Sequence, residues 1–203
     1  MSESTTEQLD PPLAKQYWWP SMAQMGMIGW IASLVIFFAA LILAFAVTLH
    51  GVEWADPIRV PVALWVSTVL LTASSITMAA SRYQLRRARI SNYRQLLWIT
   101  TFLGFAFVLS QLAGAKALFD GGIYTQANPR GSAFYTFTGI HGLHLIGGIG
   151  ALIYLLRASI DLKGVGEQPL RKARVRSQIS AWYWNFVLVS WLVLFAFLLQ
   201  WAG

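Results

Sequence analysis

The sequence predicts an all-α integral membrane protein with a bundle of five transmembrane helices. Hydrophobic residues make up 57% of the 203-residue chain and charged residues only 11%, less than half of the roughly 25% that is typical of a soluble domain. The charged residues also separate five long uncharged stretches, each of which reaches the about 20 residues that a helix needs to cross a bilayer. Because these stretches are continuously apolar rather than alternating, they predict helices and not the strands of a membrane barrel.

The five predicted spans follow a short polar arm. Residues 1–20 are polar, acidic and proline-containing, and we expect them to form an extended arm before a single membrane domain at residues 21–203. No charge occurs between Lys15 and Glu53, which places the first span near residues 25–50. The other uncharged stretches place the remaining spans near residues 60–81, 95–115, 131–156 and 177–201.

Most of the basic residues fall on one side of this arrangement. The arm, the second-to-third loop and the fourth-to-fifth loop hold 12 of the 15 Lys and Arg residues, whereas the other side holds Arg59, Lys116 and Arg130. Because cytoplasmic loops are enriched in Lys and Arg, the N-terminus is predicted to lie inside and the C-terminus outside. This bias also accounts for the net charge of +7, so no nucleic-acid partner is expected.

Aromatic residues gather near several of the predicted span boundaries. They are Tyr17, Trp18 and Trp19 before the first span, Trp182, Tyr183 and Trp184 at the start of the fifth, and Trp201 near its end. Trp and Tyr are enriched where a membrane meets water. The sequence therefore predicts that these residues form an interfacial belt.

Two histidines in the fourth span, His141 and His144, are the strongest candidates for chemistry inside the membrane. Their spacing of three places both imidazoles on one helix face. The chain has no cysteine and no charged residue well inside a span, so a metal or haem site would lack the three or four ligands that it needs. We expect interhelical hydrogen bonds from both histidines, with no catalytic residue, metal or cofactor on this chain; a haem anchor is the alternative.

Other polar and small residues within the spans predict contacts between helices. Gln111 and Asn185 are costly to leave unpaired in hydrocarbon and are expected to pair across helices. Close helix packing is predicted at the glycines of the fourth span, because glycine allows a neighbouring backbone to approach; these are Gly139, Gly142, Gly147 and Gly148. A stand-alone transporter is a further alternative, although charged residues inside the spans would be expected for it.

Three arginines at the inner end of the second span predict a lipid site. Arg82, Arg86 and Arg87 follow directly on an uncharged stretch. A guanidinium group presents forked donors that match a phosphate, and basic residues near the inner membrane surface attract anionic head groups. We therefore expect these arginines to bind the head groups of phospholipids.

Motifs occur in order on all five spans. The first span has Gly26-Met27, Ala32-Ser33 and Phe38-Ala39; the second has Leu64-Trp65-Val66-Ser67-Thr68 and Ser74-Ser75-Ile76-Thr77; the third has Leu103-Gly104 with Phe107 and Gln111; the fourth has Thr138-Gly139-Ile140-His141-Gly142-Leu143-His144; the fifth has Tyr183-Trp184-Asn185-Phe186-Val187 with Trp191. Over roughly residues 20 to 200, this combination resembles subunit III of the haem–copper (cytochrome c) oxidases, in its short five-helix bacterial form.

The resemblance implies a non-catalytic, structural and lipid-binding subunit of an aerobic respiratory terminal oxidase, which reduces oxygen to water and pumps protons. It implies a multi-pass protein of the bacterial cytoplasmic membrane. The partners that it implies are the catalytic subunit I, further oxidase subunits and phospholipid, with haem and copper held by the partner subunits. The equivalent subunit of a quinol oxidase or of a nitric oxide reductase complex is the alternative, because the sequence leaves the electron donor open.

Three positions depart from the pattern of that family. Leu34 and Leu188 stand where acidic residues are common, and Asn185 stands where the motif usually has histidine. All three replacements are neutral. A role for this chain in proton uptake is therefore not expected, whereas the structural and lipid-binding roles are unaffected.

Overall fold

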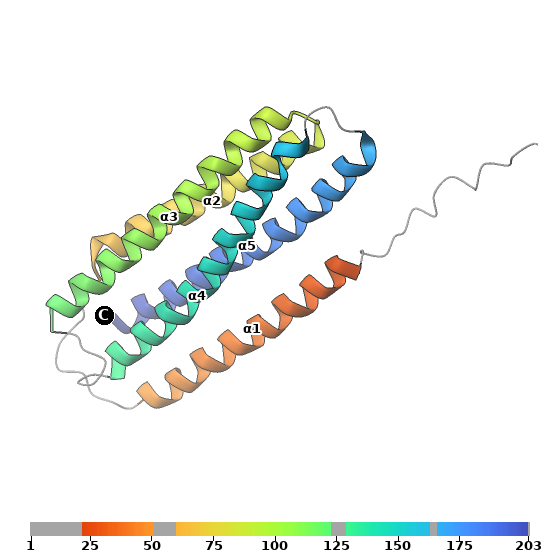
Figure 1. The fold of residues 1–203 in the computed structure, drawn as a ribbon. Coiled ribbons are helices and arrows are strands. Elements are labelled where there is room, and N and C mark those ends of the chain that lie inside the picture. The colour runs from red at the N-terminus through yellow and green to blue at the C-terminus, as the bar shows by residue number, and fades with distance from the viewer. Residues whose placement is uncertain (1–21, 51–59, 123–128, 163–165, 203) are drawn as a thin grey trace, which may run out of the picture.

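The computed structural model describes residues 22–50, 60–122, 129–162 and 166–202, which form five long α-helices and one short 3₁₀ turn (Figure 1). The elements are α1 (Met22–Leu49), α2 (Val62–Arg86), α3 (Ile90–Asp120), α4 (Pro129–Ala158), η1 (Ile160–Leu162) and α5 (Glu167–Ala202). The described residues contain no strand. All five helices are long and apolar enough to cross a membrane. The predicted all-α membrane fold with five spans is therefore confirmed.

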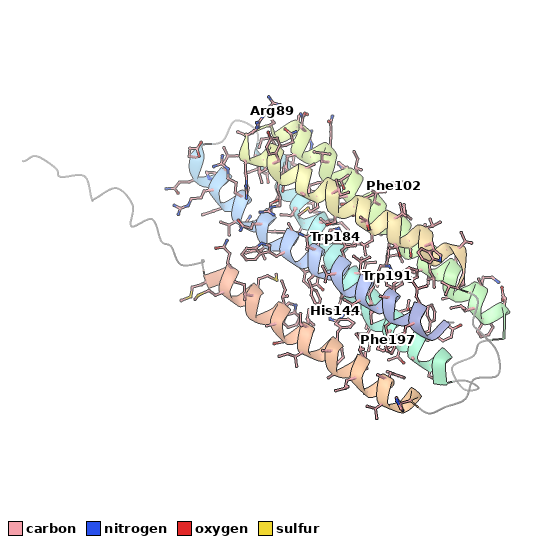
Figure 2. All side chains as sticks on the ribbon, turned by 180° about the vertical axis from the view of Figure 1, so that it is seen from behind. Arg89, Phe102, His144, Trp184, Trp191 and Phe197 are labelled. Carbon is pink, nitrogen blue, oxygen red and sulfur yellow. The ribbon has the colours of Figure 1, made fainter. Side chains whose placement is uncertain are left out.

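Consecutive helices run in opposite directions, so the α2–α3 and α4–α5 connections lie at the same end of the bundle (Figure 1). The α2–α3 connection is short and bends at Ala88, whose φ of 55° lies in the left-handed region. The end at which these connections lie carries the arginines around Arg89 (Figure 2) and those at the start of α5. The up-and-down topology thus brings two basic segments that are far apart in the sequence to one face of the protein.

The most closely packed pair is the hairpin of α2 and α3. Its buried residues recur at alternating spacings of three and four, which is the heptad pattern of helices that pair along a continuous seam. In α2 they are Leu64, Ser67, Leu71, Ser74, Met78, Ser81 and Leu85. In α3 they include Tyr93, Leu97, Thr100, Gly104, Phe107, Gln111, Gly114 and Leu118. Small residues on both helices let the two backbones approach closely, as is common between helices in membranes.

Helix α5 closes the bundle against this hairpin and against α4. Trp184 and Trp191 project from α5 into the interior, where each is at most 1% exposed (Figure 2). The prediction that Trp184 belongs to an interfacial belt is therefore wrong. The reason is that the side chain faces the interior of the bundle, where its Nε1–H donates to Ser74 of α2 and its ring lies against Gly104 of α3 and Gly148 of α4.

Helix α1 lies at the edge of the bundle and contacts mainly α5 and, less extensively, α4 (Figure 1). Its buried side chains are Leu34 and Phe38, whereas most of the others are exposed. Leu34 occupies one of the positions where an acidic residue is common in the related motif. Here it contributes an apolar side chain to one of the few buried patches that attach α1.

Several helices extend beyond the uncharged stretches from which they were predicted. The clearest case is α5, whose 36 residues would measure about 54 Å, well over the roughly 30 Å of a hydrocarbon core. Its first turns carry Glu167, Arg171 and Lys172. A charge marks where hydrocarbon ends, but a helix can continue into the head-group region because its backbone is already hydrogen-bonded.

Candidate functional site: a polar seam inside the bundle

Two tryptophans of α5 bond to hydroxyl groups of α2. The Nε1–H of Trp184 donates to Oγ of Ser74 at 3.1 Å, and that of Trp191 donates to Oγ1 of Thr68 at 3.0 Å. The hydroxyl of Ser74 in turn donates to the carbonyl oxygen of Thr100 on α3 at 3.1 Å. Three helices are thus joined by hydrogen bonds between buried groups, and these bonds favour one register of the helices.

The ring of Trp184 lies between two glycines. A Cβ atom added to Gly104 of α3 would be 2.9 Å from Cη2 of the indole, and one added to Gly148 of α4 would be 3.0 Å from its Cε3 and Cζ3. Real Cβ atoms essentially never approach as closely as at Gly104, and the contact at Gly148 is tighter than nine in ten real Cβ contacts. The two glycines therefore form a slot that only the absence of side chains leaves wide enough for the indole.

The four glycines predicted from the sequence behave differently from one another. Gly148 contacts Trp184, and Gly147 lies near the Tyr183 hydroxyl, which would be 3.6 Å from an added Cβ. Gly139 and Gly142 meet no atom of the described residues within 4 Å of such a Cβ. Close packing at those two positions does not involve the described part of this chain.

Sequence reasoning missed two further glycines, both on α3. Gly104 forms half of the slot around Trp184, and a Cβ on Gly114 would lie 2.8 Å from Cδ2 of Leu64 on α2. The signal that could have identified them is the presence of a glycine inside a long apolar span, which also identified the glycines of the fourth span. A glycine weakens the helix that contains it, so its presence there indicates that a neighbouring helix packs closely against it.

The two amides predicted to pair across helices have partners on α2. The Nε2 of Gln111 donates to Oγ of Ser67 at 2.7 Å, and the hydroxyl of Ser75 donates to Oδ1 of Asn185 at 2.5 Å. Gln111 is buried, with 7% of its surface exposed, whereas Asn185 is exposed on α5. Asn185 therefore presents its remaining polar atoms at the surface of the bundle.

The two histidines of α4 face different neighbours. His141 is 1% exposed; its ring lies against those of Phe107 and Trp191, and its Nδ1 is 3.5 Å from Oγ of Ser190. His144 turns toward α1, where its ring is 5.4 Å from that of Phe38 (Figure 2). The pair does not converge on one point, which removes the simplest geometry for a shared ligand.

The side-chain hydrogen bond of His144 stays within its own helix. Its Nδ1–H donates to the carbonyl oxygen of Ile140 at 2.8 Å. The interhelical bond at this residue is made by the backbone, because the Tyr183 hydroxyl donates to the carbonyl oxygen of His144 at 3.0 Å. His144 thus joins α1, α4 and α5 through ring packing and its main chain, where the sequence predicted an interhelical bond from the imidazole.

The three arginines predicted to bind lipid lie at the basic end of α2 and just beyond it. Arg82 is partly buried, whereas Arg86 and Arg87 are exposed. The Arg87 guanidinium lies 4.4 Å from the centre of the Tyr83 ring, and the backbone oxygen of Arg86 accepts a 3.4 Å hydrogen bond from Arg174. All three are at least partly exposed on the surface of the bundle.

The described residues bring together no group of three or more His, Cys, Asp or Glu side chains that could hold a metal ion. The interior is instead filled by rings, hydroxyls and glycines that fix one helix against the next. These features define a multi-pass helical membrane protein in which the residues of the sequence motifs pack the helices against one another.

Comparisons with known proteins agree with that class and narrow it. The family model described as cytochrome c oxidase subunit III matches residues 20–203, so the chain belongs to the cytochrome c oxidase subunit III family. It is a structural subunit of that oxidase, and the family resemblance predicted from the motifs is confirmed.

Relatives come from bacteria and animals. The chain is 33% identical to a probable cytochrome c oxidase subunit 3 of Mycobacterium bovis over 185 residues, which cover 87% of this chain and 86% of the relative. It is 31% identical to the probable subunit 3 of Nocardia farcinica, with 87% of each covered. For subunit 3 of Mus musculus the identity is also 31%, covering 88% of this chain and 69% of the relative.

Proposed function

We propose that the chain packs beside the catalytic subunit I of a bacterial cytochrome c oxidase in the cytoplasmic membrane. In this proposal the haem and copper belong to partner subunits, and this chain stabilises the assembled complex. The observation that carries the proposal is the family match over residues 20–203, on a bundle whose buried polar residues bond one helix to another. The exposed apolar side chains of α1, such as Trp30 and Ile36, offer surface for a partner helix or for lipid.

Purification of the tagged chain in mild detergent tests this proposal. We expect mass spectrometry to find subunits I and II in the eluate, with a haem absorption band that disappears when the chain is separated from them. A copper-binding dicysteine motif in the co-purified subunit II would indicate cytochrome c as donor, whereas its absence would favour the quinol oxidase alternative. Retention of the haem band by the separated chain would contradict the proposal.

We infer that the basic end of the bundle faces the cytoplasm, with the N-terminus inside and the C-terminus outside. The support is the location of Arg89 and its neighbours at one end (Figure 2), together with the enrichment of Lys and Arg in cytoplasmic loops. Lys116, which bonds to Asp120 at 2.7 Å, marks the other end.

Single cysteines test this orientation cleanly because the natural chain has none. We expect a membrane-impermeant maleimide added to intact spheroplasts to label a Lys116→Cys variant fully. A Lys172→Cys variant should be labelled only after the membrane is opened, by a difference of about tenfold or more, since an impermeant reagent cannot reach the cytoplasm. The reverse pattern would invert the topology.

We infer that the basic end also holds phospholipid. The support is an apolar groove of about 710 Å³ between α3 and α4, lined by Trp98, Phe105 and Ile153 and bordered by Arg94 and Arg157. Acyl chains fit such walls, and the two arginines can offer donors to one phosphate. Arg82, Arg86 and Arg87 remain a second proposed head-group site, near the first residues of α3.

Paired substitutions distinguish the two head-group sites. Each arginine near an anionic membrane surface contributes about 1 kcal/mol, so an Arg94→Gln/Arg157→Gln double variant should lower the affinity of this site for its lipid by roughly thirtyfold. Lipid retained by the purified oxidase is measured by mass spectrometry, with Arg82→Gln/Arg86→Gln as the parallel variant. We expect a shorter working lifetime and an unchanged initial rate of oxygen reduction. An immediate loss of rate in the intact complex would place these arginines in catalysis instead.

A further inference from the structure

A second cavity lies between α3 and α4, nearer the opposite end from the basic groove. Its volume is about 300 Å³, and most of its walls are apolar, with Phe107, Val108 and Leu145 among them. Around it, Leu112, Leu143 and Ile146 are exposed on the outside of the bundle by 62%, 70% and 61%. The cavity therefore opens toward the hydrocarbon and not toward water.

Four polar residues are among those that line this apolar cavity. The hydroxyl of Tyr135 donates to the carbonyl oxygen of Ala115 at 3.3 Å, and each of the other three has a buried atom without a partner. The atoms are Oε1 of Gln111, Oγ1 of Thr138 and Nε2 of His141. Gln111 and His141 are 7% and 1% exposed, and no donor among the described residues reaches these atoms. A buried polar atom that forms no hydrogen bond is unfavourable, so three such atoms beside one cavity point to a ligand that would bond to them.

Neighbouring hydrogen bonds fix what Gln111 presents to the cavity. The Ser67 hydroxyl donates to the carbonyl oxygen of Leu64 at 2.7 Å, so its oxygen is free to accept from Nε2 of Gln111, also at 2.7 Å. That bond orients the amide with its NH₂ group toward α2. The oxygen, which is only an acceptor, is the end left for the cavity.

The same reasoning applies to His141. The Ser190 hydroxyl donates to the carbonyl oxygen of Val187 at 3.0 Å, so it can only accept from the imidazole Nδ1 that lies 3.5 Å away. The proton of the neutral ring is then on Nδ1, which leaves Nε2 as an acceptor. Two acceptors and the hydroxyl of Thr138 therefore line the cavity, and the group that would satisfy them is a donor.

We propose that this cavity binds a neutral molecule that carries a hydroxyl donor on an apolar body and enters from the membrane, with a substituted phenol as its simplest model. The hydroxyl would donate to Gln111 or His141 and accept from Thr138. Water is the competing occupant, because it can also bond to buried polar atoms, but it would leave the apolar walls without contacts. A metal ion is not favoured, since His141 would be the only ligand of a usual type there.

Two glycines keep the cavity open. Gly139 and Gly142 both line it, yet a Cβ on either would meet no described atom within 4 Å. A leucine at either position has room at its Cβ and would extend into the cavity. Gly150 offers a matched control, because it is on the same helix, is exposed, has no atom within 4 Å of an added Cβ and does not line the cavity.

Binding of 4-fluorophenol and 4-fluorotoluene to the full-length chain in lipid nanodiscs, followed by ¹⁹F NMR, tests the proposal. We expect saturable binding of the phenol and about threefold to tenfold weaker binding of the toluene, which is the effect of one hydrogen bond. Thr138→Val should weaken the binding of 4-fluorophenol and leave the binding of 4-fluorotoluene unchanged. Gly142→Leu and Gly139→Leu should abolish the binding of both probes, whereas Gly150→Leu should change the binding of neither.

Three results would overturn the proposal. Equal affinity for the two probes would show that the polar atoms take no part, and the absence of saturable binding by either would show that the cavity holds no such guest. Cryo-electron microscopy of the intact oxidase with 4-bromophenol provides the third. Density for water or for a partner's side chain in the cavity, with no bromine signal, would assign the polar atoms to that occupant.

Discussion

Substituting Trp184 with alanine is expected to lower the free energy of unfolding of the bundle by about 3 kcal/mol, at the lower end of the range for Trp→Ala changes in protein cores. The side chain is 1% exposed and lies against Gly104 and Gly148, and its Nε1 donates to Ser74. In a bilayer the loss is one of packing and of that hydrogen bond, because lipid is as apolar as the interior. Unfolding of the purified chain in mixed micelles against increasing SDS measures the difference.

The matched control is Trp30→Ala on α1. Trp30 is 57% exposed, so its removal from the isolated chain should change the unfolding free energy by about 0.5 kcal/mol or less. A Trp184→Phe variant, which keeps most of the ring but loses the donor, should fall between the wild type and Trp184→Ala. Equal unfolding midpoints for Trp184→Ala and Trp30→Ala would refute the central position given to Trp184.

A leucine in place of Gly104 should also strongly destabilise the bundle, by about 2–3 kcal/mol, as expected for overpacking a filled interior. The indole cannot withdraw, because an added Cβ already lies 2.9 Å from its Cη2 while Gly148 confines the ring from the other helix. Reduced recovery of assembled oxidase on native gels, together with the micelle unfolding assay, measures the effect.

The double variant Gly104→Leu/Trp184→Ala makes this second prediction specific. Once the indole is removed, the leucine fills the space that it occupied, so the double variant should be destabilised by less than the sum of its single variants. Gly150→Leu serves as the single-site control and should behave like the wild type. Simple additivity would mean that Gly104 and Trp184 do not share the packing described above.

The five spans could be predicted because charged residues are expensive in hydrocarbon and so mark its limits in the sequence. The ends of the helices could not be predicted in the same way, because a helix can continue past the charged residues that limit the uncharged stretch. Helix α5, for example, begins at Glu167, before the predicted span. The wrong location for Trp184 has a different cause, because a position shortly after the last arginine does not specify which helices a side chain faces, and this ring is buried inside the bundle.

The polar residues of the site could be predicted as a set, but not their partners. Residues three apart on a helix differ in direction by about 60°, which is enough to turn His141 toward Trp191 and His144 toward Phe38. Composition likewise does not specify that Gln111 meets Ser67 or that Gly104 meets Trp184. Those contacts depend on which helices are neighbours, and an apolar sequence pattern is nearly the same for every pairing.

The peripheral position of α1 determines the order of events during synthesis. This helix leaves the ribosome first, but the helices that it contacts, α4 and α5, leave last. About 150 residues separate Leu49 from Ala202, which corresponds to about 8–30 s at typical rates of translation. Until α5 has emerged, α1 lies in the bilayer without most of its contacts to the bundle, while α2 and α3 can pair as soon as both have emerged. The first helix to be synthesised is therefore the last to complete its packing against the bundle.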